Sequence, residues 1–388
     1  MKFKKKRKQA KYLILLLIVI PIYIGIYAYF NWQPCISSGD GSDIQDALIR
    51  KGSKAKLCQK SVFFLSDTIN FTHSDQELFT EGLPTDSSKK AHLKIVNKNV
   101  SLAVNAFNQN NVKIKNIKVD GNRRELGQLV SHALIIVGGN VLYQQVDSVE
   151  AYDSRSWSTI HVNWGNFYDD ENGNKHTSCK DVHVTNNIVG PSGETTTGKW
   201  SDGISVQCEE SLVEDNTIVD VTDGGIVIFG APKSKIINNH IYAEKQPLLV
   251  GIALVDYNDY KGNYKNVQVI NNKIISDGSY IRAGIAMGSK IWHCPSDDDI
   301  SSNFGAVIKN NKLSGDYFGY GYVINGVNDW VVEENISEAK YEGIPGTGCG
   351  VPNTSPDAFL FEKNNSFGIF QSEFRDARLE KIHDILPE

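Results

Sequence analysis

Two aspartates in similar short phrases are the residues of this chain best suited to chemistry. Asp202 stands in the phrase "SDGI" and Asp223 in "TDGGI". If the two phrases occupy neighbouring turns of a repeated fold, stacking at the strand spacing would bring the carboxyl groups about 5–8 Å apart. Two carboxylates at such a distance serve as acid and base in glycoside hydrolysis, and their repulsion keeps one of them protonated near neutral pH.

A structural interpretation of the same aspartates stays open. Asp-Gly is a common turn pair, in which Asp accepts backbone N–H bonds and Gly takes a positive φ. His161, in the neighbouring strand phrase "STIHVNW", is a third catalytic candidate because it could act as a base. An exposed strand histidine without a chemical role is also common.

Polar and aromatic side chains near these strands could bind a sugar polymer. Arginine and lysine suit a carboxylated sugar, and tryptophan can stack on its ring, although the tryptophans could equally plug the ends of loops. Tyr257 or His293, together with Lys290, would be a base and a charge neutraliser for lyase or C5-epimerase chemistry. The substrate-binding candidates are Arg155, Trp157, Asn163, Lys199, Trp200, Gln207, Asp256, Tyr257, Lys290, Trp292 and His293.

The elements that would position these residues form a repeat marked by asparagine. Phrases such as "VTNNIV", "IINNHIY" and "VINNKII" each predict a short strand interrupted by Asn. A second strand lies between the markers, in phrases such as "GISVQC" and "GIVIFG". Irregular steps with a constant motif predict one structural unit with loops of variable length. The markers are Asn187, Asn216, Asn239, Asn272, Asn311, Asn335 and Asn365.

This repeat predicts an all-β, single-domain, right-handed parallel β-helix. Asn side chains at the same bend of successive coils can form a ladder of amide hydrogen bonds, and Asn tolerates the left-handed backbone needed there. A seven-bladed propeller needs steps of about 40–45 residues, which the shortest steps here exclude. Aligning the second strands predicts that Ile160, Ile204, Ile226, Ile252 and Ile285 share one inward column.

Open ends of a β-solenoid must be covered. Residues 42–52 predict an N-terminal cap helix with Ser42 as N-cap, and residues 370–386 predict a C-terminal capping segment with apolar residues on one side. The β-helix domain is therefore expected over 42–388, after a linker at 31–41.

The N-terminus predicts a membrane anchor. Residues 1–11 are rich in Lys and Arg, and the uncharged run Tyr12–Phe30 is long enough to cross a bilayer as a helix. A cleaved signal peptide is the rival interpretation, but no good cleavage site follows the run. We therefore expect a single-pass type II membrane protein with most of the chain outside the cytoplasm.

The balance of 40 basic to 45 acidic residues argues against a nucleic-acid partner.

Six cysteines, all beyond the apolar run, agree with an oxidising compartment. Chain order suggests the pairs Cys35–Cys58, Cys179–Cys208 and Cys294–Cys349 among fifteen possible pairings. No zinc motif is present, and no cofactor is implied, although the acidic loop Ser296–Asp299 could hold calcium. N-glycosylation sequons occur at Asn70, Asn99, Asn335, Asn353 and Asn364.

The Asn-marked coils and the phrase "DGI" resemble the pectin-lyase-like superfamily of right-handed parallel β-helices. More narrowly, "NNVKIKNIKVDGNR", "TDGGIVIFGAP" and "GIAMG" resemble β-helix proteins of secreted fungal protein sets. The resemblance covers residues 40–388 and implies the fold more than the activity, because the superfamily contains lyases, hydrolases, epimerases and adhesins. The aspartates are similar to the adjacent-coil pair of polygalacturonases, but the chain lacks that family's Asn-Thr-Asp, His-Gly and Arg-x-Lys elements. It also lacks the Arg-x-Pro-x-x-Arg segment of pectate lyases.

Three hypotheses follow from the sequence. The first is an extracytoplasmic, monomeric polysaccharide hydrolase that uses Asp202 and Asp223. The second keeps the fold but assigns lyase or C5-epimerase chemistry, with His161, Tyr257 or His293 as the base. The third is a non-enzymatic glycan-binding or cell-surface structural protein in which the aspartates only shape turns.

Overall fold

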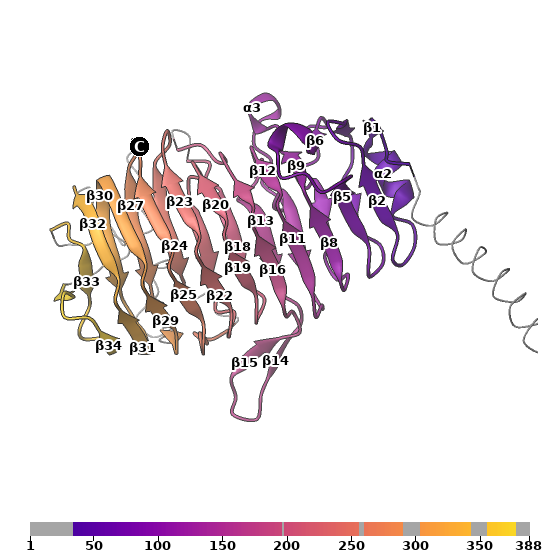
Figure 1. The fold of residues 1–388 in the computed structure, drawn as a ribbon. Helices are drawn as coiled ribbons and strands as arrows, with labels where there is room; N and C mark the ends of the chain where they lie inside the picture. The colour runs from indigo at the N-terminus through magenta and orange to yellow at the C-terminus, as the bar shows by residue number, and fades with distance from the viewer. Residues whose placement is uncertain (1–33, 196–197, 256–259, 290–302, 343–354, 378–388) are drawn as a thin grey trace, which may run out of the picture.

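The chain winds into a stack of coils made of short parallel strands (Figure 1). The computed structural model describes residues 34–195, 198–255, 260–289, 303–342 and 355–377. Two long sheets run along the stack, and within each of them successive coils pair in parallel. The chain is thus all-β and a parallel β-helix, as predicted.

One sheet has twelve strands in the described part of the chain and forms one side of the stack. Its strands are β2 (Lys54–Leu57), β5 (Glu77–Thr80), β8 (Val112–Lys115), β11 (Gln144–Asp147), β16 (Val182–Thr185), β19 (Leu212–Glu214), β22 (Lys235–Ile237), β25 (Gln268–Ile270), β28 (Asn303–Phe304), β29 (Val307–Lys309), β31 (Val327–Glu333) and β34 (Ser366–Phe370).

The other sheet has twenty-one described strands and forms two sides, because most coils contribute two strands to it. The side that follows the twelve-stranded sheet along the chain contains β1 (Gly39–Asp40), β3 (Val62–Leu65), β6 (Ala91–Ile95), β9 (Ile117–Asp120), β12 (Glu150–Tyr152), β17 (Ile188–Val189), β20 (Thr217–Val219), β23 (His240–Ala243), β26 (Lys273–Ser276) and β32 (Ile336–Tyr341). The next side contains β4 (Ile69–Asn70), β7 (Val104–Asn105), β10 (Ile135–Gly138), β13 (Ser158–Asn163), β18 (Asp202–Val206), β21 (Gly224–Ile228), β24 (Leu248–Leu254), β27 (Ile281–Met287), β33 (Phe359–Phe361) and β35 (Arg375–Asp376), while β30 (Lys312–Ile324) spans both sides.

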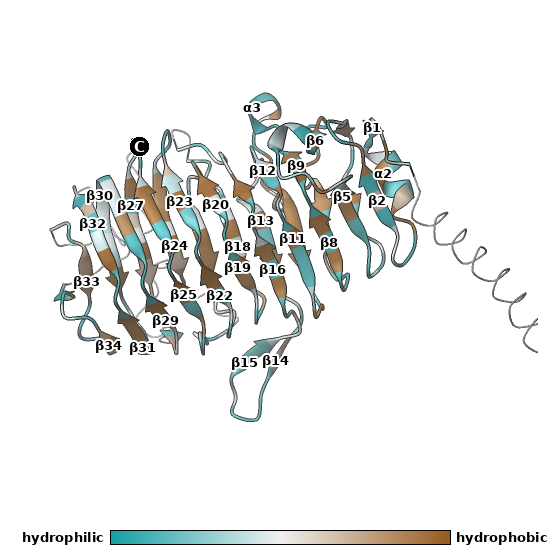
Figure 2. Cartoon of the chain, in the orientation of Figure 1, coloured by the Kyte–Doolittle hydropathy of each residue, from teal (hydrophilic) through white to brown (hydrophobic). Residues whose placement is uncertain are grey.

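The core is a set of apolar columns between these sides. Register pairs each predicted inward residue with the next, from Ile160 through Ile204, Ile226 and Ile252 to Ile285, and all five are fully buried. Figure 2 shows hydrophobic residues along the strands of the whole stack. The β-strand period of two and the burial of one face fix this register, because a slip by one residue would expose the whole column.

The predicted asparagine ladder is present and runs through six of the seven markers. Each side-chain amide from Asn187 to Asn311 donates to Oδ1 of the next asparagine at 2.9 Å, ending on Asn335. Each ladder residue is almost completely buried. Asn365 stands outside the ladder, and Gln371 instead accepts the backbone N–H of Asn335 at 2.9 Å.

The residue before each ladder asparagine has a left-handed backbone, with φ between 55° and 59°. These residues are Asn186, Asp215, Asn238, Asn271, Asn310 and Glu334. The recurring Asn-Asn dipeptide therefore combines two functions, since the first residue makes the bend and the second bonds to the next coil.

A second column consists of glycines. A Cβ placed on Gly203 or Gly225 would lie 2.5 Å from the carbonyl oxygen of the following glycine, Gly225 or Gly251, and one on Gly251 would lie 2.6 Å from that of Gly284. Real Cβ atoms do not approach a carbonyl so closely, so the glycine of the "DGI" phrase is required by coil stacking rather than by a positive φ.

The two ends of the stack differ from the sequence prediction. Helix α2 (Gly41–Ala47) lies in the predicted N-terminal segment, but its N-cap is Asp40 instead of Ser42, and it ends five residues earlier. Ile44 and Leu48 are fully buried in the core at this end. At the other end, the described part of 370–386 contains strand β35, and Phe374 packs against Phe359, Phe361 and Phe370. The rest of that segment lies outside the described residues, so the predicted cap helices are not confirmed.

Smaller elements leave the coils. They are α3 (Arg123–Leu126), the 3₁₀ turn η1 (Ser87–Lys89) and an antiparallel hairpin of β14 (Phe167–Asp169) and β15 (Lys175–Thr177), which projects from the stack in Figure 1.

Two predicted disulfides are present, Cys35–Cys58 and Cys179–Cys208, each with Cα atoms 4.9 Å apart. Cys294 and Cys349 lie outside the described residues.

The predicted localisation is contradicted. Within the described ranges, no helix is long and apolar enough to cross a membrane. The assignment of the chain as a single-pass type II membrane protein is therefore corrected. The segment Tyr12–Phe30, on which that prediction was based, lies outside the described residues.

Replacing Asn239 by Ala tests the ladder. Asn239 makes four side-chain hydrogen bonds, accepting from the N–H and the amide of Asn216 and donating to Val213 O and Asn272 Oδ1. Its loss leaves buried donors and acceptors without partners, so the free energy of unfolding should fall by about 3 kcal/mol or more in urea denaturation. The exposed Asn99→Ala is the control and should change it by less than about 0.5 kcal/mol. Equal effects in both variants would contradict the ladder's role.

Candidate functional site

Strand register brings Asp202 and Asp223 onto neighbouring coils. Asp202 begins β18 and is level with Ser158 of β13. Ile204 is level with Ile226, so Asp202 is level with Gly224, the residue after Asp223. The two aspartates are thus offset by one residue, as the sequence predicts.

The Asp202 carboxylate is buried and held by two donors. The residue is 3% exposed. Its Oδ1 accepts the backbone N–H of Gly224 at 2.9 Å, and its Oδ2 accepts the Ser205 hydroxyl at 2.8 Å. The Ser205 hydroxyl also lies 2.8 Å from Oγ of Ser158. Asp202 therefore connects three successive coils through β13, β18 and β21.

Asp223 is placed differently. Its backbone is fixed, since its N–H donates to Ser201 O at 3.2 Å and its carbonyl accepts from Val250 N–H at 3.1 Å. The residue as a whole is partly exposed, but its Oδ1 is buried and has no hydrogen-bond partner. A buried carboxylate oxygen without a donor is costly to ionise. Asp223 is the member of the pair that is poised to hold a proton.

The electrostatics agree with this difference. Burial raises the pKa of Asp202 to about 7, although the bonds from Gly224 and Ser205 favour its ionised form. Burial, and then the neighbouring Asp202 charge, raise the pKa of Asp223 well above its ordinary value. Because two donors stabilise only the Asp202 carboxylate, we expect the pair to share one proton near neutral pH, mainly on Asp223.

His161 lies one coil earlier and is not solvated. It is level with Ser205, is 6% exposed, and its Nε2 is 2.7 Å from Oε1 of Gln207. Burial lowers the pKa of His161 to about 4 despite that bond, so the imidazole is neutral at physiological pH. Its ring meets Trp157 edge-on, with centroids 4.8 Å apart. In the preceding coil its register partner is Ile136.

Gln207 is likewise buried, at 3% exposure, and the Tyr260 hydroxyl donates to its carbonyl at 2.6 Å. Tyr260 in turn contacts Phe167 of the β14–β15 hairpin, with ring centroids 5.0 Å apart. The outward residues Val227, Ala253 and Ala286 are also fully buried. The strand face beside the pair is therefore covered at His161 and Gln207, two residues that the sequence predicts to be available to a substrate.

Arg155 corrects another expectation. It is 2% exposed, and its five N–H groups all donate to backbone carbonyls, those of Gly127, Asn97, Val100, Lys98 and Leu126. No N–H is left for a sugar carboxylate. Arg155 instead links two loops of preceding coils, at residues 97–100 and 126–127, to its own coil.

Four other predicted residues are partly exposed. Trp157 precedes β13, and Asn163 ends it. Lys199 exchanges two backbone hydrogen bonds with Glu194, at 2.8 and 3.0 Å, which closes a hairpin directly before Trp200 and Ser201. Trp157, Asn163, Lys199 and Trp200 are the described residues with which a ligand could make contact. Asp256, Tyr257, Lys290, Trp292 and His293 lie outside the described residues.

No group of three or more His, Cys, Asp or Glu side chains in the described part of the chain is arranged to hold a metal ion. The acidic loop Ser296–Asp299 lies outside that part.

Of the sequons, Asn99 and Asn364 are exposed. Asn335 is 4% exposed and its amide belongs to the ladder, which corrects its candidacy for glycosylation. Asn70 bonds to Asn105 and Thr68 at partial burial, and Asn353 is not among the described residues.

Sequence reasoning missed three contributors to the site. Ser158 and Ser205 were not candidates, although Ser205 occupies the polar column two residues before Gln207. Arg123 was not a candidate either. A buried cluster at the base of the hairpin was also missed, in which fully buried Glu209 lies 2.9 Å from Nδ1 of His176.

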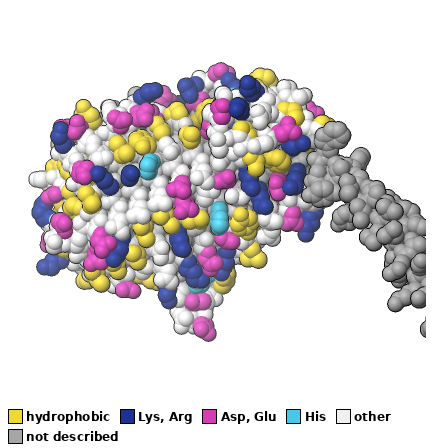
Figure 3. Space-filling model, viewed as in Figure 1, with side chains coloured by type: hydrophobic (Ala, Val, Ile, Leu, Met, Phe, Trp, Pro, Cys, Tyr) yellow, Lys and Arg dark blue, Asp and Glu magenta, His cyan; other side chains and the backbone are white. Residues whose placement is uncertain are grey.

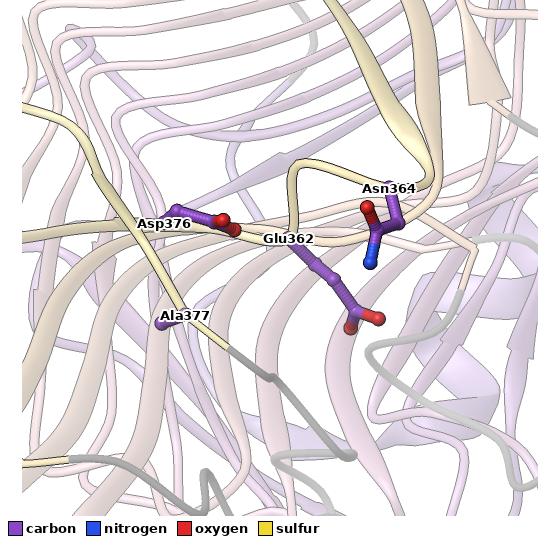
Figure 4. Close-up of a pocket in the computed structure, with 4 residues that line it drawn as sticks. All are labelled: Glu362, Asn364, Asp376 and Ala377. Atoms are coloured by element: carbon purple, nitrogen blue, oxygen red, sulfur yellow. The ribbon is translucent and has the colours of Figure 1, made fainter.

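A hollow of about 440 Å³ near the C-terminal end is separate from the pair (Figure 4). Glu362, Asn364, Asp376 and Ala377 line it, on and beside strands that follow β18 by several coils. Figure 3 shows basic and acidic side chains interspersed over the viewed face, without a large basic patch among the described residues there.

Comparisons with known proteins give structural likeness only. No protein-family model matches the sequence, and no curated protein matches it. The Dettilon tailspike protein (gp208) aligns with a TM-score of 0.40 and 11% identity, covering 86% of this chain and 64% of its own length. An alginate lyase from Paenibacillus sp. str. FPU-7 gives 0.28 and 9%, covering 78% and 98%. The Streptococcus pneumoniae surface protein and adhesin PfbA gives 0.36 and 13%, covering 79% and 96%. This chain therefore spans less than two thirds of the tailspike, and no activity is transferred at these scores.

The pair predicts a specific pH dependence of stability. A carboxyl whose pKa is raised by folding contributes stability that is present below its ordinary pKa and is lost as the pH rises through the folded value. Compared with Asp202→Asn/Asp223→Asn, the wild type should thus lose stability between pH 4 and pH 8, on the order of 2–4 kcal/mol. Urea unfolding at each pH measures the difference. Parallel curves for the two proteins would show that the carboxyls titrate normally.

Proposed function

We propose that the protein acts on a polysaccharide as a glycoside hydrolase, with Asp202 and Asp223 as its two carboxyl groups. The observation that carries the proposal is the asymmetry of the pair. One carboxylate is anchored by two donors, and the neighbouring one is partly exposed with a buried oxygen that has no partner. Acid and base roles are separated in this way when environments push two pKa values apart.

In this proposal Asp223 is the general acid. It is protonated near neutral pH and reaches the surface, so it can donate to the glycosidic oxygen of the leaving sugar. Asp202 is the ionised member and stabilises the positive charge that develops on the sugar ring in the transition state. Water then bonds to the anomeric carbon as the glycosidic bond breaks, and the proton that this water loses restores the acid form of Asp223. Its bonds to Gly224 and Ser205 hold the carboxylate in position without neutralising it.

The surrounding side chains would bind the polymer. Trp157 and Trp200 are partly exposed aromatic rings on the turns that enter β13 and β18, where a sugar ring could stack. Lys199, beside Trp200, could meet an anionic group. The ring of neutral His161 packs edge-on against Trp157. His161 therefore serves here to hold part of the binding surface in place.

Replacing each aspartate by Asn tests the proposal. The full chain, wild type and variants, is incubated with neutral, uronic-acid and amino-sugar polymers while new reducing ends and new sugar double bonds are followed together. We expect reducing ends without double bonds, and a loss of about 10²–10⁴-fold in kcat for Asp223→Asn. Asp277→Asn, in an exposed Asp-Gly turn of a later coil, is the control and should keep full activity.

Double bonds in place of reducing ends alone would assign the chain to the lyases. Unchanged turnover in the Asp202→Asn/Asp223→Asn protein would refute the carboxylate mechanism.

A non-enzymatic role as a glycan-binding or surface protein is the second candidate. It is favoured by the Asp202 contacts, because the bonds to Gly224 N–H and Ser205 satisfy a buried carboxylate that joins neighbouring coils, as a purely structural aspartate does. Under this function no polymer is cleaved. Glycan binding would be lost on Trp157→Ala or Trp200→Ala and kept in the aspartate variants.

A further inference from the structure

A long side chain from two coils away holds the loop beside the aspartate pair. Arg123, in α3, extends to the loop that precedes Asp202, of which the structure describes residues 193–195 and 198–200, and its side chain is only 12% exposed. Its guanidinium donates to Gly193 O and to Lys199 O, the latter at 3.5 Å, and lies 3.9 Å from the Glu194 carboxylate. It therefore holds both ends of the Glu194–Lys199 hairpin.

The base of α3 makes this reach possible. The backbone N–H of Arg123 donates to Asp153 O at 3.2 Å, so α3 rests on the turn of the next coil. The adjacent Arg124 turns away, with its side chain 71% exposed, and pairs with Asp153 at 3.2 Å. The charged groups around Arg123 are Glu194, Asp153 and Arg124, and burial lowers the pKa of its guanidinium.

The loop held by Arg123 rests directly on the backbone of the pair. A Cβ on Gly193, whose φ is 86°, would overlap Oγ1 of Thr222 and lie 3.0 Å from Ser201 N. Thr222 Oγ1 also accepts the Ser201 N–H at 3.1 Å. Ser201 and Thr222 each directly precede one aspartate, so the loop and the two aspartates form one packed layer.

A second contact ties the same loop to Asp202. Oγ1 of Thr159 lies 3.0 Å from Oγ of Ser192 and 3.0 Å from the carbonyl oxygen of Asp202. Ser192 is itself 2% exposed. The position of this loop and the burial of Asp202 are therefore coupled.

We infer that Arg123 is a positioning residue for the Asp202–Asp223 pair, because it clamps Gly193, Glu194 and Lys199 against the backbone that carries both carboxyls. This inference deepens the proposed function and rests on it where the reaction is concerned. Its structural part, the burial of Asp202, is testable without any substrate.

The experiment compares the titration of the pair in several backgrounds of the full chain. Wild type, Arg123→Ala, Arg123→Lys and Arg124→Ala are each made with and without Asp202→Asn/Asp223→Asn. For each background, the difference in unfolding free energy between the two forms is followed from pH 4 to pH 8, which isolates the titration of the pair. Arg124→Ala is the matched control, since it removes a neighbouring cation that does not touch the loop.

In Arg123→Ala the midpoint should move down by about one pH unit or more, because water that reaches the carboxylates stabilises their charged form. Arg124→Ala should match the wild type. Arg123→Lys should shift the midpoint less, since a single ammonium keeps the charge but cannot span both carbonyls. If Arg123→Ala does not fold, Arg123→Lys carries the test. A folded variant whose curve coincides with that of the wild type would overturn the inference.

The experiments distinguish a failure of the clamp proposal from a failure of the hydrolase proposal. A shifted midpoint in a protein that cleaves no polymer leaves the clamp in place and rejects the hydrolase. Polymer cleavage by the wild type, together with an unshifted midpoint in Arg123→Ala, keeps the hydrolase and rejects the clamp. If both hold, Arg123→Ala should lower kcat at the neutral pH where the wild type needs a protonated Asp223.

Discussion

The register of the coils is the constraint on which the rest of the structure depends. Each ladder asparagine is bonded to the next through its amide, and at several positions the backbone N–H is bonded to the same oxygen. The glycine column lets the backbones approach at a second corner. With two corners fixed and an apolar column between them, a coil cannot slide without burying polar groups or exposing apolar ones. Loops can then vary in length without disturbing the strands.

The candidate site is a consequence of that register. Because β18 and β21 are held in step, two aspartates that differ in local sequence arrive side by side with an offset of one residue. The offset gives Asp202 the Gly224 N–H as a donor, while Oδ1 of Asp223 has none. A difference of one residue in the chain thereby becomes a difference in protonation. Arg123 and Arg155 fix the loops in addition to the strands. Each of them uses one buried guanidinium to link loops of different coils.

The sequence predicts what is periodic and local. The column from Ile160 to Ile285, the ladder, two disulfide pairs and the offset of the aspartates all follow from repeated phrases, because stacking transfers spacing in the chain into spacing in space. Arg155 and Arg123 could not be foreseen, since their partners lie 28 to 76 residues away in irregular loops. Asn335 shows the same limit. Its sequon is local, but its place in the ladder depends on Asn311 and Ile308 of the preceding coil.

The most direct test of the account is a carbon-13 NMR titration of the carboxyl carbons of Asp202 and Asp223, assigned from the single Asn variants. The account predicts that Asp202 loses its proton near pH 7 and that Asp223 keeps its proton to a higher pH than Asp202 does. If both carboxyls instead titrate together near pH 4, as solvated aspartates do, the pair is two turn-forming residues and the acid role of Asp223 is wrong.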